Sequence, residues 1–145
     1  MKKLPRKFYT DDTLRAARQL IGKYLVTELK EGKTVGKIIE TEAYCGIDDP
    51  ACHAYKGRMT ERTKILFSAP GSVYVYLIYG MYYCFNIIAH KRGEVGGVFI
   101  RAVEPVEGIE VMLKRHKMEP HGHSPWYLLL PPLFCFAKQG GGVIR

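Results

Sequence analysis

Residues 73–89 hold two runs of β-branched and aromatic residues separated by three residues, a pattern that constrains the fold more than any other part of the chain. The runs are 73–78 and 82–89, and Tyr79-Gly80-Met81 lies between them. Two such runs around a short glycine-containing segment are typical of antiparallel strands joined by a tight turn. The sequence therefore predicts a β-hairpin with Tyr79 at its turn.

This hairpin is dense in tyrosine, and the density has two interpretations. The β-propensity of tyrosine accounts for those within the strands. Tyr79, however, lies at the turn beside Gly80, where strand propensity gives no reason for an aromatic ring. A rigid aromatic at a hairpin tip can insert between base pairs and fill the gap left when a nucleotide rotates out of the stack. The tyrosines of the hairpin are Tyr74, Tyr76, Tyr79, Tyr82 and Tyr83.

Hydrophobic periodicity predicts the remaining elements. We expect a first helix capped by Thr10 or Asp11 and ended by Gly22. Its apolar stripe comprises Leu14, Ala17, Leu20 and Ile21. The other expected elements are strands at 24–29, 35–44 and 98–103, the last closed by Glu104-Pro105, and helices at 61–67 and 107–118.

The strand that ends at Tyr44 carries two carboxylates. Alternation predicts that Ile38, Glu40, Glu42 and Tyr44 share one face, and that Ile39, Thr41 and Ala43 share the other. Such a face is unusual for a core, although a solvated strand face is the plain alternative. Glu42 lies nearer than Glu40 to the loop end, where functional sites gather.

The charge of the chain favours a polyanionic partner. The 22 lysines and arginines outnumber the 14 aspartates and glutamates, so the formal net charge is +8. An excess of this size suggests nucleic acid before membrane, with an ordinary basic protein as the alternative. The longest apolar run, 126–137, is too short to span a bilayer and contains two prolines.

Length and cysteine usage limit the class further. A chain of 145 residues fits one domain with one core. Met1-Lys2-Lys3 is followed by Leu-Pro-Arg-Lys and not by an apolar segment, so no secretion signal is expected. None of the four cysteines forms a CxxC pair, which favours reduced thiols and a cytoplasmic location.

A zinc site is the competing explanation for the loop after Tyr44. It would draw on Cys45, Cys52 and His53, with Cys84 or His90 as a further ligand. This spacing fits no standard finger or ribbon, so we expect no metal. A single histidine in such a loop is, by itself, most often a surface residue.

Three segments, taken in order, resemble the methylpurine (3-methyladenine or alkyladenine) DNA glycosylases. They are Glu-Thr-Glu-Ala-Tyr with the following histidine, Pro-Gly-Ser-Val-Tyr-Val-Tyr-Leu-Ile-Tyr-Gly-Met-Tyr-Tyr-Cys-Phe-Asn, and Phe-Ile-Arg-Ala-Val-Glu-Pro. The likeness covers roughly residues 6–119. It implies an α+β fold, a single mixed domain with a curved antiparallel β-sheet, flanking helices and a hairpin that protrudes into the DNA minor groove.

The resemblance also implies roles for the residues around the flipped base. Glu42 is similar to the catalytic general base that activates water for attack on the sugar. Tyr44, His53 and Tyr76 resemble the walls of the base pocket. Asn86 resembles the pocket residue that disfavours the amino group of guanine.

Four further residues match positions that hold the DNA in this family. Tyr79 is similar to the intercalating wedge, and Met81 and Tyr82 lie near it on the DNA face. Arg101 resembles the arginine that positions the backbone of the lesion nucleotide.

The implied activity is base-excision repair of double-stranded DNA that contains alkylated or deaminated purines. A carboxylate can stabilise the oxocarbenium character of the sugar and deprotonate water. No lysine in these motifs is placed as a nucleophile, so we expect a monofunctional hydrolase without strand cleavage. We further expect no cofactor, no membrane partner, a monomer, and a bacterial-type location with the nucleoid.

The chain departs from the family after about residue 120. The Gly-Pro-Gly-Lys-Leu segment of the family does not appear, and residues 121–145 contain no acidic residue. We therefore expect a glycosylase domain over 1–120 that lacks its usual C-terminal part, and a divergent tail over 121–145 from a truncation or frameshift. Thr63 is a smaller departure, because relatives usually carry Asn there.

Two alternative functions follow. The chain could be a weakly active or non-catalytic DNA-binding remnant of the same family, with the basic surface and the Tyr79 wedge but little turnover. It could also be a small metal-binding or protein-interaction domain.

Overall fold

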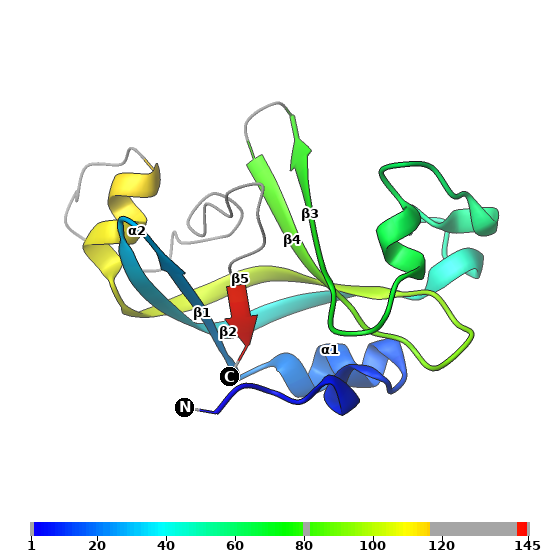
Figure 1. The fold of residues 1–145 in the computed structure, drawn as a ribbon, viewed down its shortest axis with the longest axis horizontal. Coiled ribbons are helices and arrows are strands. Elements are labelled where there is room, and N and C mark those ends of the chain that lie inside the picture. The colour runs from blue at the N-terminus through cyan, green and yellow to red at the C-terminus, as the bar shows by residue number, and fades with distance from the viewer. Residues whose placement is uncertain (1, 80–81, 117–141, 145) are drawn as a thin grey trace.

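An antiparallel sheet is the framework of the molecule in this computed structural model, which describes residues 2–79, 82–116 and 142–144 (Figure 1). Within these ranges the sheet has six strands in the order β3-β4-β5-β2-β1-β6, and neighbouring strands pair antiparallel. The strands are β1 Tyr24–Leu29, β2 Gly32–Tyr44, β3 Val73–Ile78, β4 Tyr82–Ile88, β5 Gly97–Glu107 and β6 Gly142–Ile144. The long strands β2 and β5 curve across the width of the molecule (Figure 1). The expected α+β fold with a curved antiparallel sheet is confirmed.

Helix α1, Thr13–Leu20, packs beneath the sheet (Figure 1). Its N-cap is Asp12, whose side chain accepts a hydrogen bond from the backbone N–H of Arg15. The cap therefore lies one or two residues beyond the predicted positions. Helix α2, Ile109–His116, follows β5 at the other end of the sheet (Figure 1).

The buried face of α1 differs in phase from the predicted stripe. Ala17 and Leu20 are buried as expected, but Leu14 and Ile21 are exposed. Thr13 and Ala16 take their place, because the Thr13 hydroxyl donates to the carbonyl oxygen of Ala89 at 2.8 Å. This contact between distant parts of the chain rotates the helix away from the orientation that apolar spacing alone predicts.

The larger of two core clusters among the described residues lies between α1, the N-terminal segment and the sheet. Burial of each large aliphatic side chain there contributes about 1.5–3 kcal/mol. The cluster includes Leu20, Leu25, Ile38, Phe85, Val98, Ile100 and Met112.

The ladder between β2 and β5 contains bulges that correct the predicted face alternation. Ile38 pairs with Val103 and Glu40 with Ala102, so Ile39 is an extra residue on β2. Ile38 is consequently buried in the same core cluster that Ala43 packs against, and does not share the face of the glutamates. A bulge interrupts the two-residue period, which sequence alternation alone does not reveal.

Strand β5 also runs further than predicted. Glu104-Pro105 does not close it, because Pro105 pairs with Gly36 beside a register shift. Proline is tolerated where a strand is irregular and its missing N–H is not needed.

The predicted hairpin is present as β3 and β4. Leu77 pairs with Tyr83 and Ile78 with Tyr82, which leaves Tyr79 at the turn. The hairpin projects from the curved sheet (Figure 1). Strand β3 has the predicted bounds, and β4 ends at Ile88, one residue earlier than predicted.

The C-terminal residues 142–144 form a strand that the sequence analysis did not predict. β6 pairs with the outer side of β1, with Ile144 opposite Leu25. The Ile144 side chain is buried in the core, and its carbonyl oxygen accepts a hydrogen bond from the Leu4 backbone. The division of the chain into 1–120 and 121–145 stays a prediction, since most of the second range lies outside the described residues.

None of the helices described here has the length and apolar content needed to cross a membrane.

Candidate active site

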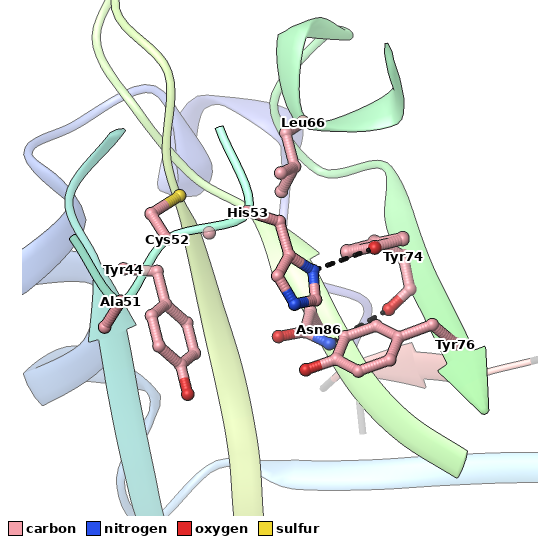
Figure 2. A pocket seen from close by; sticks show the side chains of 9 residues that line it. Tyr44, Ala51, Cys52, His53, Leu66, Tyr74, Tyr76 and Asn86 are labelled. Carbon is pink, nitrogen blue, oxygen red and sulfur yellow. Dashed lines mark hydrogen bonds between the residues drawn. The ribbon is translucent and has the colours of Figure 1, made fainter. Parts of the chain in front are cut away.

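Four of the sequence-predicted residues line one pocket (Figure 2). Tyr44 comes from the end of β2, His53 from the following loop, Tyr76 from β3 and Asn86 from β4. The cavity volume is about 70 Å³, within a hollow of about 380 Å³ that opens to solvent. Ala51, Cys52, Leu66, Tyr74 and Gly97 complete the lining.

Glycine at position 46 helps to bring His53 to this pocket. The chain leaves β2 after Tyr44 and turns at Gly46, where φ is +90°. A Cβ there would collide with the carbonyl oxygen of Val95. Only glycine fits both the backbone angle and the close approach, so this position sets the path of the loop that carries His53.

Aromatic rings form the wall on which His53 rests. Tyr74 and Tyr76 are two residues apart on β3, so both face the pocket, with ring centroids 5.0 Å apart. The His53 ring lies 4.9 Å from that of Tyr76, and its Nδ1 is 3.1 Å from the Tyr74 hydroxyl (Figure 2). Burial raises the pKa of both tyrosines, which keeps them as neutral phenols.

The environment of His53 favours its neutral form. Burial lowers the pKa of His53, and the positive charge of Arg62 lowers it further. A neutral imidazole offers one donor and one acceptor nitrogen. With Nδ1 engaged by Tyr74, the other side of the ring can face a ligand.

Hydrogen bonds hold Asn86 in the lining of the pocket. Its side chain is buried, and Nδ2 donates to the carbonyl oxygens of Tyr74 at 3.2 Å and Cys84 at 3.4 Å. Two backbone acceptors hold the amide, and rotation of the side chain would break both hydrogen bonds.

Glu42 lies beside this pocket and is joined to it through Tyr44. The Tyr44 hydroxyl donates to Oε2 of Glu42 at 2.7 Å, and Arg101 Nη1 donates to Oε1. Burial, with the hydrogen bond to Glu42 as the second cause, raises the pKa of Tyr44 to about 12. The Glu42 side chain is 37% exposed, so solvent reaches the carboxylate. A carboxylate has about four lone-pair positions, which leaves room for a water molecule beside the two donors.

Arg101 binds two carboxylates from one strand. Its Nε lies 3.1 Å from Oε1 of Glu40 while Nη1 faces Glu42. The hydrogen bond and charge of Glu42 raise the pKa of Arg101. In the β2–β5 ladder Arg101 is the extra residue between Ala102 and Ile100, which pair with Glu40 and Thr41. A bulge of this kind redirects a side chain, and here it directs the guanidinium to the glutamates.

The residues expected on the DNA face are described in part. Tyr79 is 82% exposed, with φ of +53°, at the tip of the hairpin. Met81 lies outside the described residues. Tyr82 begins β4, and nothing of its side chain is described.

Three further residues belong to the site without having been assigned to it from the sequence. They are Tyr74 in the pocket wall, Glu40 beside Arg101, and Arg62, whose guanidinium carbon is 4.9 Å from the centroid of the Tyr76 ring. Tyr74 could have been assigned from the sequence, because residues two apart on a strand face the same side, as Tyr74 and Tyr76 do. The other two depend on contacts between distant segments.

The residues of the zinc alternative do not gather around one point. Among residues 2–79, 82–116 and 142–144, no group of three or more histidine, cysteine or acidic side chains is placed to hold a metal ion.

This chain is therefore an α+β protein in which a curved antiparallel sheet with a projecting hairpin carries a tyrosine-lined pocket beside a glutamate. The family model that matches this chain is that of methylpurine-DNA glycosylase, over residues 7–125. The chain belongs to the methylpurine-DNA glycosylase family.

Curated relatives agree with the family model. One from Clostridium acetobutylicum is 54% identical over 113 residues, which are 78% of this chain and 55% of the relative. One from Clostridium tetani is 56% identical over 110 residues, which are 76% of this chain and 54% of the relative. One from Bacillus cytotoxicus is 55% identical over 119 residues, which are 81% of this chain and 58% of the relative. Each is named "Putative 3-methyladenine DNA glycosylase". The chain thus spans little more than half the length of the relatives that it matches.

Proposed function

We propose that this protein is a DNA glycosylase that hydrolyses the N-glycosidic bond of alkylated or deaminated purines. The observation that carries the proposal is the hydrogen bond between Tyr44 and Glu42. It connects a wall of the aromatic pocket to a solvent-accessible carboxylate. A base held against Tyr44 would therefore have its sugar close to Glu42.

The pocket suits a flat, electron-poor ring. Three tyrosines and a neutral histidine surround it, and cationic ligands gain about 0.5–2 kcal/mol from each favourable contact with an aromatic face. An alkylated purine in DNA carries a positive charge, so it fits this lining. Asn86 would disfavour the exocyclic amino group of guanine without excluding it, so 7-methylguanine, whose positive charge weakens its C1′–N9 bond, stays a substrate.

Glu42 would activate the attacking water. The carboxylate takes a proton from the water while the oxygen of that water bonds to C1′ of the deoxyribose. The C1′–N9 bond breaks, and its electron pair leaves with the purine. A cationic purine departs as a neutral molecule, whereas a neutral purine would also take a proton from solvent, to which the pocket opens. Arg101 would hold Glu42 in position, and the negative charge of Glu42 would stabilise the oxocarbenium character of the sugar.

Tyr79 would keep the extruded nucleotide out of the stack. The hairpin projects from the sheet (Figure 1). The Tyr79 ring is exposed at its turn, which is the placement that a wedge between base pairs needs. Met81 and Tyr82, which follow Tyr79 closely in the sequence, would contact the minor groove beside it. Double-stranded DNA is then the partner, and the net charge of +8 would support phosphate contacts. We propose that the protein acts as a monomer.

A weakly active or non-catalytic DNA-binding protein is the second candidate. The observations that favour it are the net charge of +8 and the exposed Tyr79, which would serve DNA binding with or without release of a base. The catalytic residues proposed here all lie within the matched part, residues 7–125.

Release of free base from a defined duplex separates the two candidates. Duplexes with one 7-methylguanine or one hypoxanthine are incubated with excess protein, and the released base is quantified. Release supports the glycosylase, and binding without release supports the second candidate. Borohydride treatment during the reaction tests the hydrolytic route, because a trapped covalent protein–DNA adduct would contradict it.

A further inference from the structure

Arg62 places a positive charge against the pocket wall without lining the pocket. Its guanidinium carbon lies 4.9 Å from the centroid of the Tyr76 ring. Arg62 lines a neighbouring hollow together with His53 and Arg58, whereas the described lining of the base pocket does not include it. Arg62 therefore lies against Tyr76 but outside the described lining of the base pocket.

The charge of Arg62 influences groups in the pocket. It lowers the pKa of His53, after burial as the larger cause, and it also acts to lower the pKa of Tyr74. Both residues line the base pocket. A charge that acts on the lining must also act on a charged ligand beside the lining.

The guanidinium of Arg62 also makes a cation–π contact with the electron-rich ring of Tyr76. A cation held near an aromatic ring polarises the ring toward itself, which weakens the attraction of the ring for a second cation on its other side. Direct repulsion across Tyr76 acts in the same direction. A neutral ligand experiences neither penalty, while it still stacks on the ring.

We propose that Arg62 determines specificity by disfavouring positively charged, alkylated purines relative to neutral, deaminated purines in the pocket formed by Tyr76. This inference rests on the proposed function. It assigns charge selection to a residue outside the pocket, on the loop between His53 and β3.

The expected size of the effect is modest. Arg62 is exposed, so solvent and salt reduce its influence. Removal of its charge should change the selectivity between the two kinds of purine by about fivefold at low ionic strength, which is the size expected of a screened charge at this range.

Three variants separate charge from packing. Arg62→Gln removes the charge, and Arg62→Lys keeps it while losing the planar guanidinium. Arg58→Gln removes the same charge from the same hollow at a residue for which no contact with the Tyr76 ring is described. Arg58 and Arg62 are both exposed on this loop, so each of the three variants is expected to fold.

The measured quantity is a ratio of single-turnover rates, for a duplex with 7-methylguanine over a duplex with hypoxanthine. Arg62→Gln should raise this ratio about fivefold, and the rise should shrink as salt is added. Arg62→Lys and Arg58→Gln should leave the ratio near that of the parent. An unchanged ratio in Arg62→Gln, or an equal rise in Arg58→Gln, would overturn the proposal.

A second measurement keeps the proposal testable without turnover. The His53 ring resonance is followed by NMR while 7-methylguanosine, a cation below neutral pH, or inosine is added. Arg62→Gln should strengthen binding of the cation relative to inosine, and an unchanged preference would count against Arg62. If the parent releases neither base from DNA but this preference shifts, the proposed catalysis fails while the role of Arg62 stands.

Discussion

Tyr44 donates a hydrogen bond of 2.7 Å to Glu42, which lies two residues earlier on the same strand. The two side chains share a face of β2 beyond its bulge, so the strand itself sets their relation. One residue thus lines the pocket and the other would carry the reaction. In the proposed mechanism, the coupling between base binding and chemistry would depend on this contact.

Tyr44→Phe should separate the two contributions of that tyrosine. The ring stays in the pocket wall, but Glu42 loses a donor, and a hydrogen bond to a charged group contributes about 1.5–3 kcal/mol. We expect base release to slow by about 10- to 100-fold, with little change in the affinity for lesion-containing DNA. Single-turnover rates and binding titrations measure the two, and loss of affinity with an unchanged rate would contradict this role.

Tyr79→Ser should impair flipping more than it impairs general DNA affinity. The ring is 82% exposed at the hairpin tip, so its removal costs the fold little, while the gap left by an extruded nucleotide stays unfilled. A fluorescent base analogue beside the lesion reports flipping, and titration with undamaged duplex reports general affinity. Equal losses in both measurements would argue against the wedge.

The free energy of unfolding should fall as the pH is lowered through the ordinary range of histidine titration. Burial lowers the pKa of His53 below its unfolded value, so the unfolded chain binds the proton first. The loss begins near the unfolded pKa, about 6.5, and ends once the pH is below the folded pKa. Denaturant titrations across this range should show that the free energy of unfolding depends less steeply on pH in His53→Asn than in the parent. An identical slope would remove His53 as a cause.

Ile144→Ala should destabilise the protein through the strand that was not predicted. Ile144 is buried in the core, and truncation of a buried isoleucine to alanine costs about 2–5 kcal/mol. Val106→Ala is a matched control, since Val106 lies exposed on β5. Urea unfolding of both variants measures the difference, and equal midpoints would mean that β6 adds nothing to the core.

Local patterns predicted the hairpin well, and for a physical reason. The runs 24–29 and 73–78 have the bounds of β1 and β3, because β-branched and aromatic residues bounded by turn residues describe a strand without reference to the rest of the chain. The resemblance then named Tyr44, His53, Tyr76 and Asn86, and the structure brings all four to one pocket.

Features that depend on long-range contacts were not predictable in the same way. The bulges at Ile39 and Arg101 arise from the register between β2 and β5. The phase of α1 depends on a bond from Thr13 to Ala89, and Arg62 reaches Tyr76 from another loop. No local period encodes any of these, so a reading by alternation placed Ile38 on the wrong face of the strand.

Base release by the parent protein and by Glu42→Gln tests the central claim most directly. Glu40→Gln is the matched control, because it makes the same change on the same strand, and Glu40 also binds Arg101. We predict measurable release of 7-methylguanine by the parent, and a loss of about 10²- to 10⁴-fold in Glu42→Gln, the usual contribution of a general base. The loss in Glu40→Gln should be much smaller. Release by Glu42→Gln at the rate of the parent would contradict the account.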